Sequence, residues 1–487
     1  MSVDVAVRLR PDSSPAGEDL ADRLAVSAGR RAAGTALLEE WIADRRRRSP
    51  FAVARVPFDR LEGWRFAPGS GDLVHRSGRF FSVQGIHVQT DHGPVAEWSQ
   101  PILDQPDRAI LGILAREVDG VLHFLMQAKM EPGNFGTVQI SPTVQATPSN
   151  YQRAHNGRLA PYVEYFAEPG RARVLVDVLQ SEQGSWFRGK RNRNVVMEVA
   201  GDVPHHDDFI WLTLGELYAL LRLPNVVNMD SRTVLSCLPL PAGEGADGDG
   251  FRDALRRSTS RTDDRALCSS LEVASWLTGR KSAYALTTRQ VPLRSVAGWT
   301  RTEDEIRHAT GRYFSIVGVE VTATNREVGH WCQPLLAPRG RGLVAFVVRR
   351  IDGVLHLLAR ADLRPGYRDV VELGPTVQCT PENFAGAPER RPAFLDLVLS
   401  GDVTVRYDVP QSEEGGRFHH AVTRHMVVEV GDDFPLGVPA DFTWVTLSQL
   451  KRLVASSYQV NIEARSLLAC LHALSGDGPG AGAGGPR

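Results

Sequence analysis

The hydrophobic positions of the chain follow two spacings, one typical of helices and one typical of strands. Leu and Trp recur every three to four residues in some segments, which predicts amphipathic helices. Other segments are apolar at alternate or consecutive positions and are interrupted by Gly, which predicts strands of a mixed or antiparallel sheet. The predicted helices are 33–48, 211–223, 231–238 and 266–281, and the predicted strands are 79–88, 109–129 with a turn at Asp119-Gly120, 171–179 and 194–200. We therefore expect an α+β protein.

The chain also contains an internal repeat. The segment GRFFSVQGIHV at Gly78 returns as GRYFSIVGVEV at Gly311, with six of eleven residues identical. The same offset of 233 relates residues 98–101 to residues 331–334. This predicts a tandem duplication of two pseudo-equivalent domains, 29–240 and 251–474. Residues 241–250 are expected to be a flexible linker, and residues 1–28 and 475–487 disordered tails.

Composition and charge exclude several classes of partner. The 56 Lys and Arg residues balance 57 Asp and Glu residues, so the chain has no overall field to attract nucleic acid. No apolar run is long enough to span a bilayer, and the first 28 residues lack the apolar core of a secretory signal. The five cysteines never pair as CxxC, which argues against a disulfide framework and a structural zinc. We expect a cytoplasmic protein with no nucleic-acid or membrane partner.

Polar side chains gather in three segments beside predicted strands, 127–134, 141–151 and 180–194. Loops at strand ends commonly carry functional groups. Any one of these segments could be a solvated loop, but three of them predict a shared pocket. The single histidine with the best placement for such a pocket is His155, because it lies in a polar loop.

The third segment combines cations with aromatic rings. It contains Trp186, Phe187, Arg188, Lys190, Arg191 and Arg193. Two or three cations can neutralise a diphosphate while a ring stacks on a base, so a nucleotide is the expected ligand. The alternative is an exposed basic strand end that pairs with surface acids.

Several cofactor motifs are missing from the sequence. It has no GxGxxG after a strand, no GxxxxGK[ST] and no GxSxG, and its histidines lack metal-ligand spacing. Dinucleotide, P-loop, α/β-hydrolase and metal chemistry therefore have no support.

Six motifs together resemble the NDP-hexose 2,3-dehydratases of deoxysugar biosynthesis. They are WSQP at 98–101, FLMQAKMEPGN at 124–134, SPTVQATPSNY at 141–151, QSEQGSWF at 180–187, KRNRN at 190–194 and NMDSRTVLSCLP at 228–239. The resemblance runs from about Trp41 to Leu471. It implies a Nudix-like module in each repeat, a homodimer, and dTDP-4-keto-6-deoxyglucose as substrate, without cofactor or metal. Neither copy contains the Glu-rich metal-binding box of Nudix hydrolases, so that likeness is one of fold only.

The implied reaction removes water across C2 and C3 of the sugar. The 4-keto group acidifies the C3 proton, so a base can take it while a cation stabilises the enolate oxygen at C4. Expulsion of the C2 hydroxyl then gives a 3,4-diketo-2,6-dideoxy sugar nucleotide with no redox change. This product is labile, and an NADPH-dependent 3-ketoreductase would consume it in antibiotic biosynthesis. Glu182 is the expected base and Lys129 the expected cation.

The candidate site residues come from these segments and from neighbouring motifs. Expected catalytic residues are Lys129, Glu182, Glu131, His155 and Tyr151, and expected substrate-binding residues are Trp64, Arg79, Gln127, Asn134, Thr143, Gln145, Ser181, Trp186, Lys190, Arg191, Arg193 and Arg232. Trp186 or Trp64 is expected to pack on thymine.

Comparison of the two copies favours the first pocket as the catalytic one. The expected cation Lys129 is replaced by Asp362 in the second copy, which reverses the charge. Glu182 and Arg232 keep their residue types in both copies, which fits either a shared nucleotide cradle or a buried structural pair. We expect the second pocket to be vestigial or accessory.

Two other functions stay open. A non-catalytic nucleotide-sugar binding protein would have the same cationic clamp. A metal-dependent nucleotide-sugar pyrophosphatase would release dTMP in the presence of magnesium.

Overall fold

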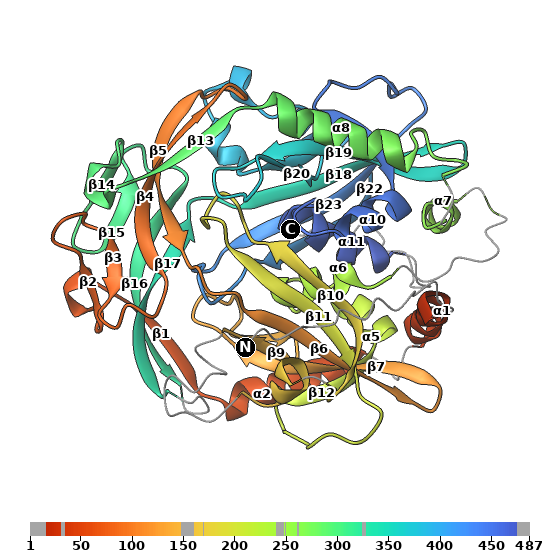
Figure 1. Ribbon diagram of the computed structural model, residues 1–487, viewed down its shortest axis with the longest axis horizontal. Coiled ribbons are helices and arrows are strands. Elements are labelled where there is room, and N and C mark those ends of the chain that lie inside the picture. Colours follow the sequence, from red (N-terminus) through yellow and green to blue (C-terminus); the bar gives the residue numbers. More distant parts are fainter. Residues whose placement is uncertain are drawn as a thin grey trace, which may run out of the picture.

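The computed structural model describes residues 16–30, 35–147, 160–168, 170–239, 248, 250–260, 263–323 and 328–474. It has two similar halves, each with a large mixed sheet, a smaller sheet and helices, so the expected α+β duplication is confirmed. Figure 1 shows the two large sheets on either side of a central group of helices, with the smaller sheets together at one side. Within these ranges, no helix is long and apolar enough to cross a membrane.

Each large sheet has seven strands and one parallel pair of neighbours. The order is β10-β11-β6-β7-β12 in the first half, with β8 beside β7 and β9 beside β6, and the second half repeats this arrangement. Only β6 with β11 and β18 with β23 run parallel among these described pairs. The first-half strands are β6 Ile110–Val118, β7 Val121–Met130, β8 Val138–Ser141, β9 Val144–Ala146, β10 Arg173–Ser181, β11 Arg191–Glu198 and β12 Phe209–Thr213. The second-half strands are β18 Gly342–Ile351, β19 Val354–Leu363, β20 Val371–Gly374, β21 Val377–Cys379, β22 Thr404–Ser412, β23 Val422–Val430 and β24 Phe442–Thr446.

The turn between β6 and β7 shows how the sequence determines these sheets. Asp119 and Gly120 have positive φ values of 51° and 75°, and Asp352 and Gly353 have values of 51° and 76°. Two-residue hairpin turns of type I′ need positive φ at both central positions, which Asp-Gly tolerates well. The predicted hairpin is confirmed in both halves.

The smaller sheets exchange strands between the halves. β13 Leu286–Val291 of the second half pairs with β4 Ser82–Thr90 of the first half, and β1 Phe51–Val56 of the first half pairs with β16 Phe314–Ala323 of the second half. The repeats therefore do not coincide with self-contained sheets, because the leading strand of each repeat belongs to the sheet of the other half. The remaining strands are β2 Trp64–Phe66, β3 Leu73–His75, β5 Glu97–Asp104, β14 Trp299–Arg301, β15 Glu305–His308 and β17 His330–Pro338.

One glycine in each copy permits this exchange. A Cβ atom on Gly85 would lie 2.7 Å from the carbonyl oxygen of Val291, and one on Gly318 would lie 2.7 Å from that of Val56. A side chain at either position would push the exchanged strand away. Glycine within a strand commonly marks such a close approach of another backbone.

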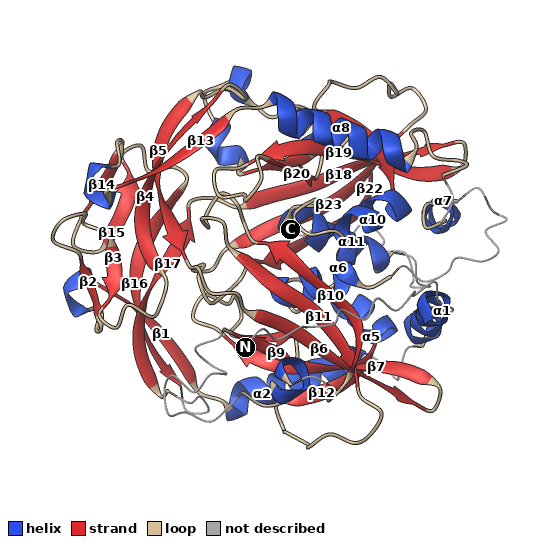
Figure 2. Ribbon diagram, in the orientation of Figure 1, coloured by secondary structure: helices blue, strands red, loops and turns tan. Residues whose placement is uncertain are grey.

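The helices α6 Met229–Cys237 and α11 Ile462–His472 pack against each other between the two large sheets (Figure 2). Apolar side chains from both large sheets and from both helices form one continuous core. The other helices are α1 Ala16–Gly29, α2 Thr35–Arg48, α4 Glu164–Ala167, α5 Leu214–Leu220, α7 Phe251–Arg257, α8 Ser270–Ala283, α9 Leu395–Leu399 and α10 Leu447–Val454. Short 3-10 helices lie at Phe58–Arg60, Leu293–Ser295, Pro381–Phe384 and Pro388–Arg390.

Two sequence expectations need correction. The prediction of disorder over residues 1–28 is wrong for residues 16–28, which belong to α1, and Leu20 and Leu24 of this helix are buried in the main core. The helix predicted at 211–223 is shorter, because residues 209–213 form β12. A capping box between Thr213 and Glu216 then starts α5. Most of the expected linker and the tail after residue 474 lie outside the described residues.

The two smaller sheets pack on each other around Phe187 and Phe418. These rings come from two equivalent loops, the β10–β11 loop at residues 182–190 and the β22–β23 loop at residues 413–421. Both loops therefore lie where the smaller sheets meet the large ones. This position brings residues of both halves into the candidate site.

Candidate active site

A cavity of about 180 Å³ lies against the large sheet of the first half. This is smaller than the 300–1,000 Å³ typical of complete small-molecule sites, so it can enclose only part of a nucleotide sugar. The cavity is lined by Gln105, Ala109, Leu111, Lys129, Glu131, Gln145, Ala146, Thr147, Glu182, Phe187, Lys190, Asn192, Asp230, Glu414, Gly416 and Arg417. The expected Lys129, Glu131, Gln145, Glu182 and Lys190 thus meet in one cavity.

The end of β7 supplies an ion pair. Lys129 Nζ lies 3.4 Å from Glu131 Oε1, and both side chains are largely buried. Gln145 on β9 donates from Nε2 to the same Glu131 oxygen over 3.0 Å. Glu131 therefore has a cation and an amide donor on one oxygen, and Lys129 is held at the cavity wall.

Glu182 lies in the loop after β10 and has a fixed donor. Asn192 Nδ2 donates to Glu182 Oε1 over 2.6 Å, while Asn192 Oδ1 accepts from the backbone N–H of Ala109 over 3.0 Å. Burial raises the pKa of Glu182, although Lys190 opposes this. Burial also lowers the pKa of Lys190 to about 8, and Lys190 Nζ donates to the carbonyl oxygen of Asp107. Both groups therefore titrate closer to neutral pH than in water.

The second half contributes a wall that sequence reasoning missed. Glu414, Gly416 and Arg417 of the β22–β23 loop line the first-half cavity. The Arg417 guanidinium lies 4.2 Å from the centroid of the Phe81 ring and donates from Nε to Gln105 Oε1 over 3.0 Å. Because Arg417 and Lys190 interact electrostatically, the cavity holds two neighbouring cations from different halves.

A fourth carboxyl group, Asp230, was also missed. It is 2% exposed, lies in the first turn of α6, and its Oδ2 has no hydrogen-bond partner among the described residues. Burial raises the pKa of Asp230 well above its usual value, and Glu414, Glu182 and Glu131 add to this effect. Little in the sequence pointed to it, because Asp230 lies two residues after the helix cap Asn228, and acids are common in the first turn of exposed helices.

Strand alternation separates the expected basic cluster. Residues of β11 point alternately to opposite faces, so Lys190 and Asn192 reach the cavity while Arg191 and Arg193 do not. Arg193 instead binds Asp177 through two hydrogen bonds of 2.8 and 2.6 Å. Arg191 donates from Nη1 to Tyr458 Oη over 3.0 Å.

Trp64 and Trp186, the two residues expected to pack on thymine, do not line the cavity. The Trp64 indole N–H donates to the carbonyl oxygen of Cys332 over 2.8 Å. Trp186 packs on Phe418, with ring centroids 4.6 Å apart. Arg79 is exposed, in the turn before β4.

Five other candidates do not line the cavity. Thr143 accepts from Leu114 N–H and donates to the Leu125 carbonyl, and Ser181 Oγ donates to Glu372 Oε2 over 2.5 Å. Asn134 Nδ2 donates to the Thr137 carbonyl over 3.0 Å. Gln127 lies two residues before Lys129 on β7, outside the cavity lining, and Arg232 is fully buried between the halves. Tyr151 and His155 lie outside the described residues.

The equivalent position in the second half is filled by its own side chains. Asp362 accepts from Arg360, Arg364 and Tyr367 over 2.5, 2.9 and 2.7 Å, and from Asn461 over 3.2 Å. Burial alone would raise the pKa of Asp362, but Arg364 and Arg360 lower it to about 2. The charge reversal seen in the sequence thus produces a closed ion-pair network at this place.

The metal-binding potential of the site can be judged from its donors. Four carboxyl groups line the first cavity, yet in the described part of the chain no three His, Cys, Asp or Glu side chains are grouped so as to hold a metal ion. Lys129, Gln145 and Asn192 occupy carboxylate oxygens that a cation would need.

Comparison with known proteins identifies the family. The sequence model of the NDP-hexose 2,3-dehydratase family matches residues 35–238 and again residues 270–471. A dTDP-4-dehydro-6-deoxy-alpha-D-glucopyranose 2,3-dehydratase of Saccharopolyspora spinosa is 51% identical over 89% of this chain and 90% of its own length. Proteins of the same name from Amycolatopsis orientalis and Streptomyces violaceoruber are 47% and 48% identical, over 94% and 92% of this chain and 95% and 99% of their own lengths. The chain, with its duplicated halves and its polar cavity in the first, therefore belongs to the NDP-hexose 2,3-dehydratase family.

Proposed function

We propose that the first-half cavity is the active site of a hydro-lyase that removes water across C2 and C3 of dTDP-4-keto-6-deoxyglucose. The family and relatives about 50% identical over most of the chain support this substrate and reaction. The observation that carries the placement is the convergence of Lys129 and Glu182 on one cavity. An elimination beside a ketone needs both a base and a stabilised enolate oxygen.

Glu182 removes the C3 proton in this proposal. Its buried carboxylate has a raised pKa, which makes it a stronger base than an exposed glutamate. The bond from Asn192 orients one of its oxygens. The electron pair of the broken C3–H bond moves into the C3–C4 bond, and negative charge develops on the C4 oxygen.

Lys129 stabilises that oxygen. Its ammonium group is largely buried, so its field is weakly screened by solvent. Glu131 holds Lys129 in place through the ion pair, and Gln145 in turn holds Glu131 through a hydrogen bond. Collapse of the enolate then expels the C2 oxygen, and the C3 enol that forms tautomerises to the 3,4-diketone.

Lys190 and Arg417 bind the diphosphate in this proposal. Both line the cavity as cations, together with Lys129. Burial lowers the pKa of both groups, and a bound diphosphate would raise both again. The nucleoside lies beyond the cavity, because about 180 Å³ leaves no room for it beside the sugar.

We further propose that the second half lost this activity. Its network around Asp362 occupies the position of Lys129 and contains two arginines in place of Gln127 and Glu131. The parallel strand pair within an otherwise antiparallel sheet, followed by a helix, is consistent with the proposed Nudix-like module in each half. The family resemblance supports a homodimer and coupling to an NADPH-dependent 3-ketoreductase, and a cytoplasmic location is part of the same proposal.

The reaction is tested by incubating the protein with dTDP-4-keto-6-deoxyglucose and a trapping 3-ketoreductase. We expect a reduced 2,6-dideoxy sugar nucleotide, identified by mass spectrometry. Intact substrate after long incubation would indicate binding without catalysis, and release of dTMP only with magnesium would indicate a pyrophosphatase.

A further inference from the structure

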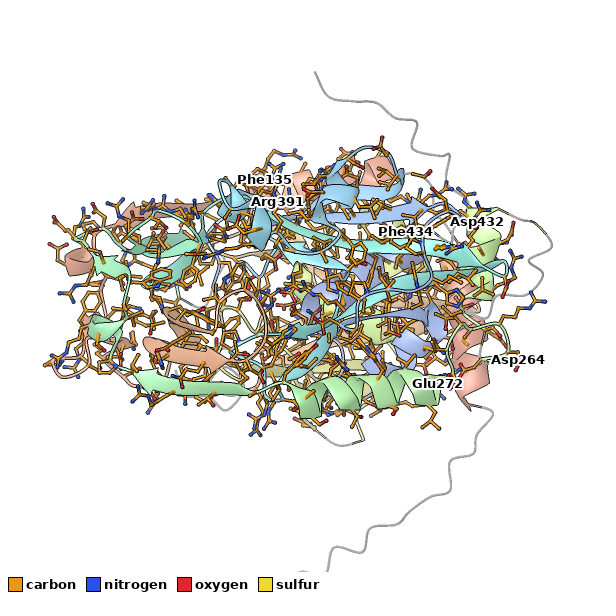
Figure 3. The ribbon with its side chains drawn as sticks, turned by 90° about the horizontal axis from the view of Figure 1, so that it is seen from above. Phe135, Asp264, Glu272, Arg391, Asp432 and Phe434 are labelled. Atoms are coloured by element: carbon orange, nitrogen blue, oxygen red, sulfur yellow. The ribbon has the colours of Figure 1, made fainter. Side chains whose placement is uncertain are left out.

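The β22–β23 loop of the second half is clamped to the first half next to the cavity. Gly133 N–H donates to the Gly415 carbonyl over 2.7 Å, and His420 N–H donates to the Gly133 carbonyl over 2.9 Å. A Cβ atom on Gly133 would lie only 1.7 Å from the Phe418 carbonyl oxygen, so the two backbones touch. Phe135, labelled at the surface in Figure 3, packs edge-on against His420. The loop is therefore a fixed part of the first-half site.

A buried arginine secures the start of the same loop. Arg232 of α6 donates from Nη2 to the Ser412 carbonyl over 2.7 Å and from Nη1 to the Val227 carbonyl over 2.6 Å. Its Nε donates to Ser466 Oγ over 2.6 Å. The chain thus leaves β22 at a defined point, two residues before Glu414.

The carboxyl group of Glu414 lies among other acids in the cavity wall. A Cβ atom on Gly416 would be 2.3 Å from Glu414 Oε1 and 3.5 Å from Glu131 Oε1, so both oxygens approach the same point. Burial raises the pKa of Glu414 to about 7; Arg417 opposes this, and Glu131 and Glu182 add to it. A carboxyl group in these surroundings carries a proton at neutral pH for a substantial part of the time.

The equivalent site in the second half lacks this acid. The residue equivalent to Glu414 is Gln183, whose Nε2 donates to Glu413 Oε2 over 3.0 Å. An amide has no acidic proton to transfer. By contrast, the buried Asp230 has an acidic counterpart, Glu463, so Glu414 distinguishes the first site from the second and Asp230 does not.

We propose that Glu414, a residue of the second half, is the general acid that protonates the departing C2 hydroxyl in the first-half cavity. The proposal rests on the proposed dehydration. The C2–O bond breaks with its electron pair on oxygen, the carboxyl proton of Glu414 moves to that oxygen, and water leaves. Glu182 has already received the C3 proton, so one proton is taken and one is given in each turnover. The duplicated half is then required for catalysis even though its own site is filled.

The test compares two leaving groups in the Glu414→Gln variant. One substrate is dTDP-4-keto-6-deoxyglucose, and the other is its 2-deoxy-2-fluoro analogue, because fluoride departs without needing a proton. Water loss should fall by about 100-fold or more, the usual contribution of general acid catalysis. Fluoride release, followed with an ion-selective electrode, should stay within about threefold of the unchanged protein.

Hydrogen exchange supplies a second readout. In heavy water, the Glu414→Gln variant should still replace the C3 hydrogen of the normal substrate with deuterium, because Glu182 and Lys129 are intact. The matched control is Glu413→Gln, the neighbouring position, whose carboxylate accepts from Gln183 and Thr423 and lies outside the cavity lining. This control should keep both reactions.

Three outcomes contradict the proposal. Equal loss of water and fluoride release would make Glu414 a structural residue. Loss of C3 exchange together with turnover would make it the base. Unchanged water loss would remove it from the reaction. If the unchanged protein eliminates neither water nor fluoride, the proposed dehydration itself fails, which is a separate result.

Discussion

Acid should weaken the contact between the halves through one buried histidine. His425 of β23 is 1% exposed, and its Nδ1 lies 3.0 Å from the Thr423 carbonyl oxygen, so Nδ1 carries the proton. Its Nε2 lies 3.0 Å from Ser466 Oγ, which itself accepts from Arg232. The hydroxyl of Ser466 must then donate to Nε2, and a second proton on the ring would face this donor. Burial, reinforced by Arg232, lowers the pKa of His425 to about 3.

The size of the effect follows from this shift. A histidine in the unfolded chain titrates near pH 6.5. Below that pH the unfolded chain therefore binds a proton at His425, while His425 in the folded chain stays neutral. The stability from neutral His425 is complete above about pH 6.5 and is lost as the pH falls toward 3. Since pH 5 is about 1.5 units below the pKa of the unfolded histidine, the free energy of unfolding falls by about 2 kcal/mol at this pH.

The assay is urea unfolding of the unchanged protein and of His425→Asn at pH 7.5 and pH 5. Asn is the residue at the equivalent position 194 of the first half. We expect the variant to be less stable at pH 7.5, because it loses the Ser466 contact, and the difference to shrink by about 2 kcal/mol at pH 5. His205→Asn, at an exposed site, is the control and should follow the unchanged protein. Parallel pH profiles for the unchanged protein and His425→Asn would refute the reasoning.

Three further predictions concern the cavity. Lys190→Ala should weaken dTDP binding by about ten- to a hundredfold in calorimetry, because a charge-assisted contact is lost. Arg193→Ala should leave dTDP affinity unchanged, since Arg193 is bound to Asp177. The reverse pattern would show that Arg193, and not Lys190, binds the diphosphate. Glu182→Gln should slow C3 exchange in heavy water by about 100-fold or more, and normal exchange would exclude it as the base. Turnover should survive dialysis against EDTA, and a loss restored by magnesium or zinc would establish a metal requirement.

The repeat and most elements could be predicted from the sequence because they depend on local patterns. Helical spacing located α2 and α8, and Asp-Gly located the hairpins. Such patterns say which face of a strand is buried and do not say which strand covers it. The exchange of β1 and β13 therefore could not be predicted, although Gly85 within an apolar run was a signal of close backbone approach.

The site was predictable only in part, for the same reason. Lys129, Glu131, Gln145, Glu182 and Lys190 were found because their segments lie at strand ends of the first half. Glu414 and Arg417 were missed because the comparison of the two copies assumed that each half builds its site from its own residues alone. The alternation of side chains along a strand is a property of the sequence alone. It would have separated Lys190 from its neighbour Arg191, although both were expected to bind substrate.

The central claim is that catalysis occurs in the first half, and one pair of variants tests it most directly. Lys129→Met and Asp362→Asn change equivalent positions, and circular dichroism first establishes that both fold. Trapped product formation should fall by about 100- to 1,000-fold in Lys129→Met, because a charge that stabilises the enolate is lost, with dTDP affinity unchanged. Asp362→Asn keeps an acceptor for Arg364 and Tyr367 and should retain near-normal turnover. Normal turnover in Lys129→Met together with loss of activity in Asp362→Asn would place the reaction in the second half and contradict the account.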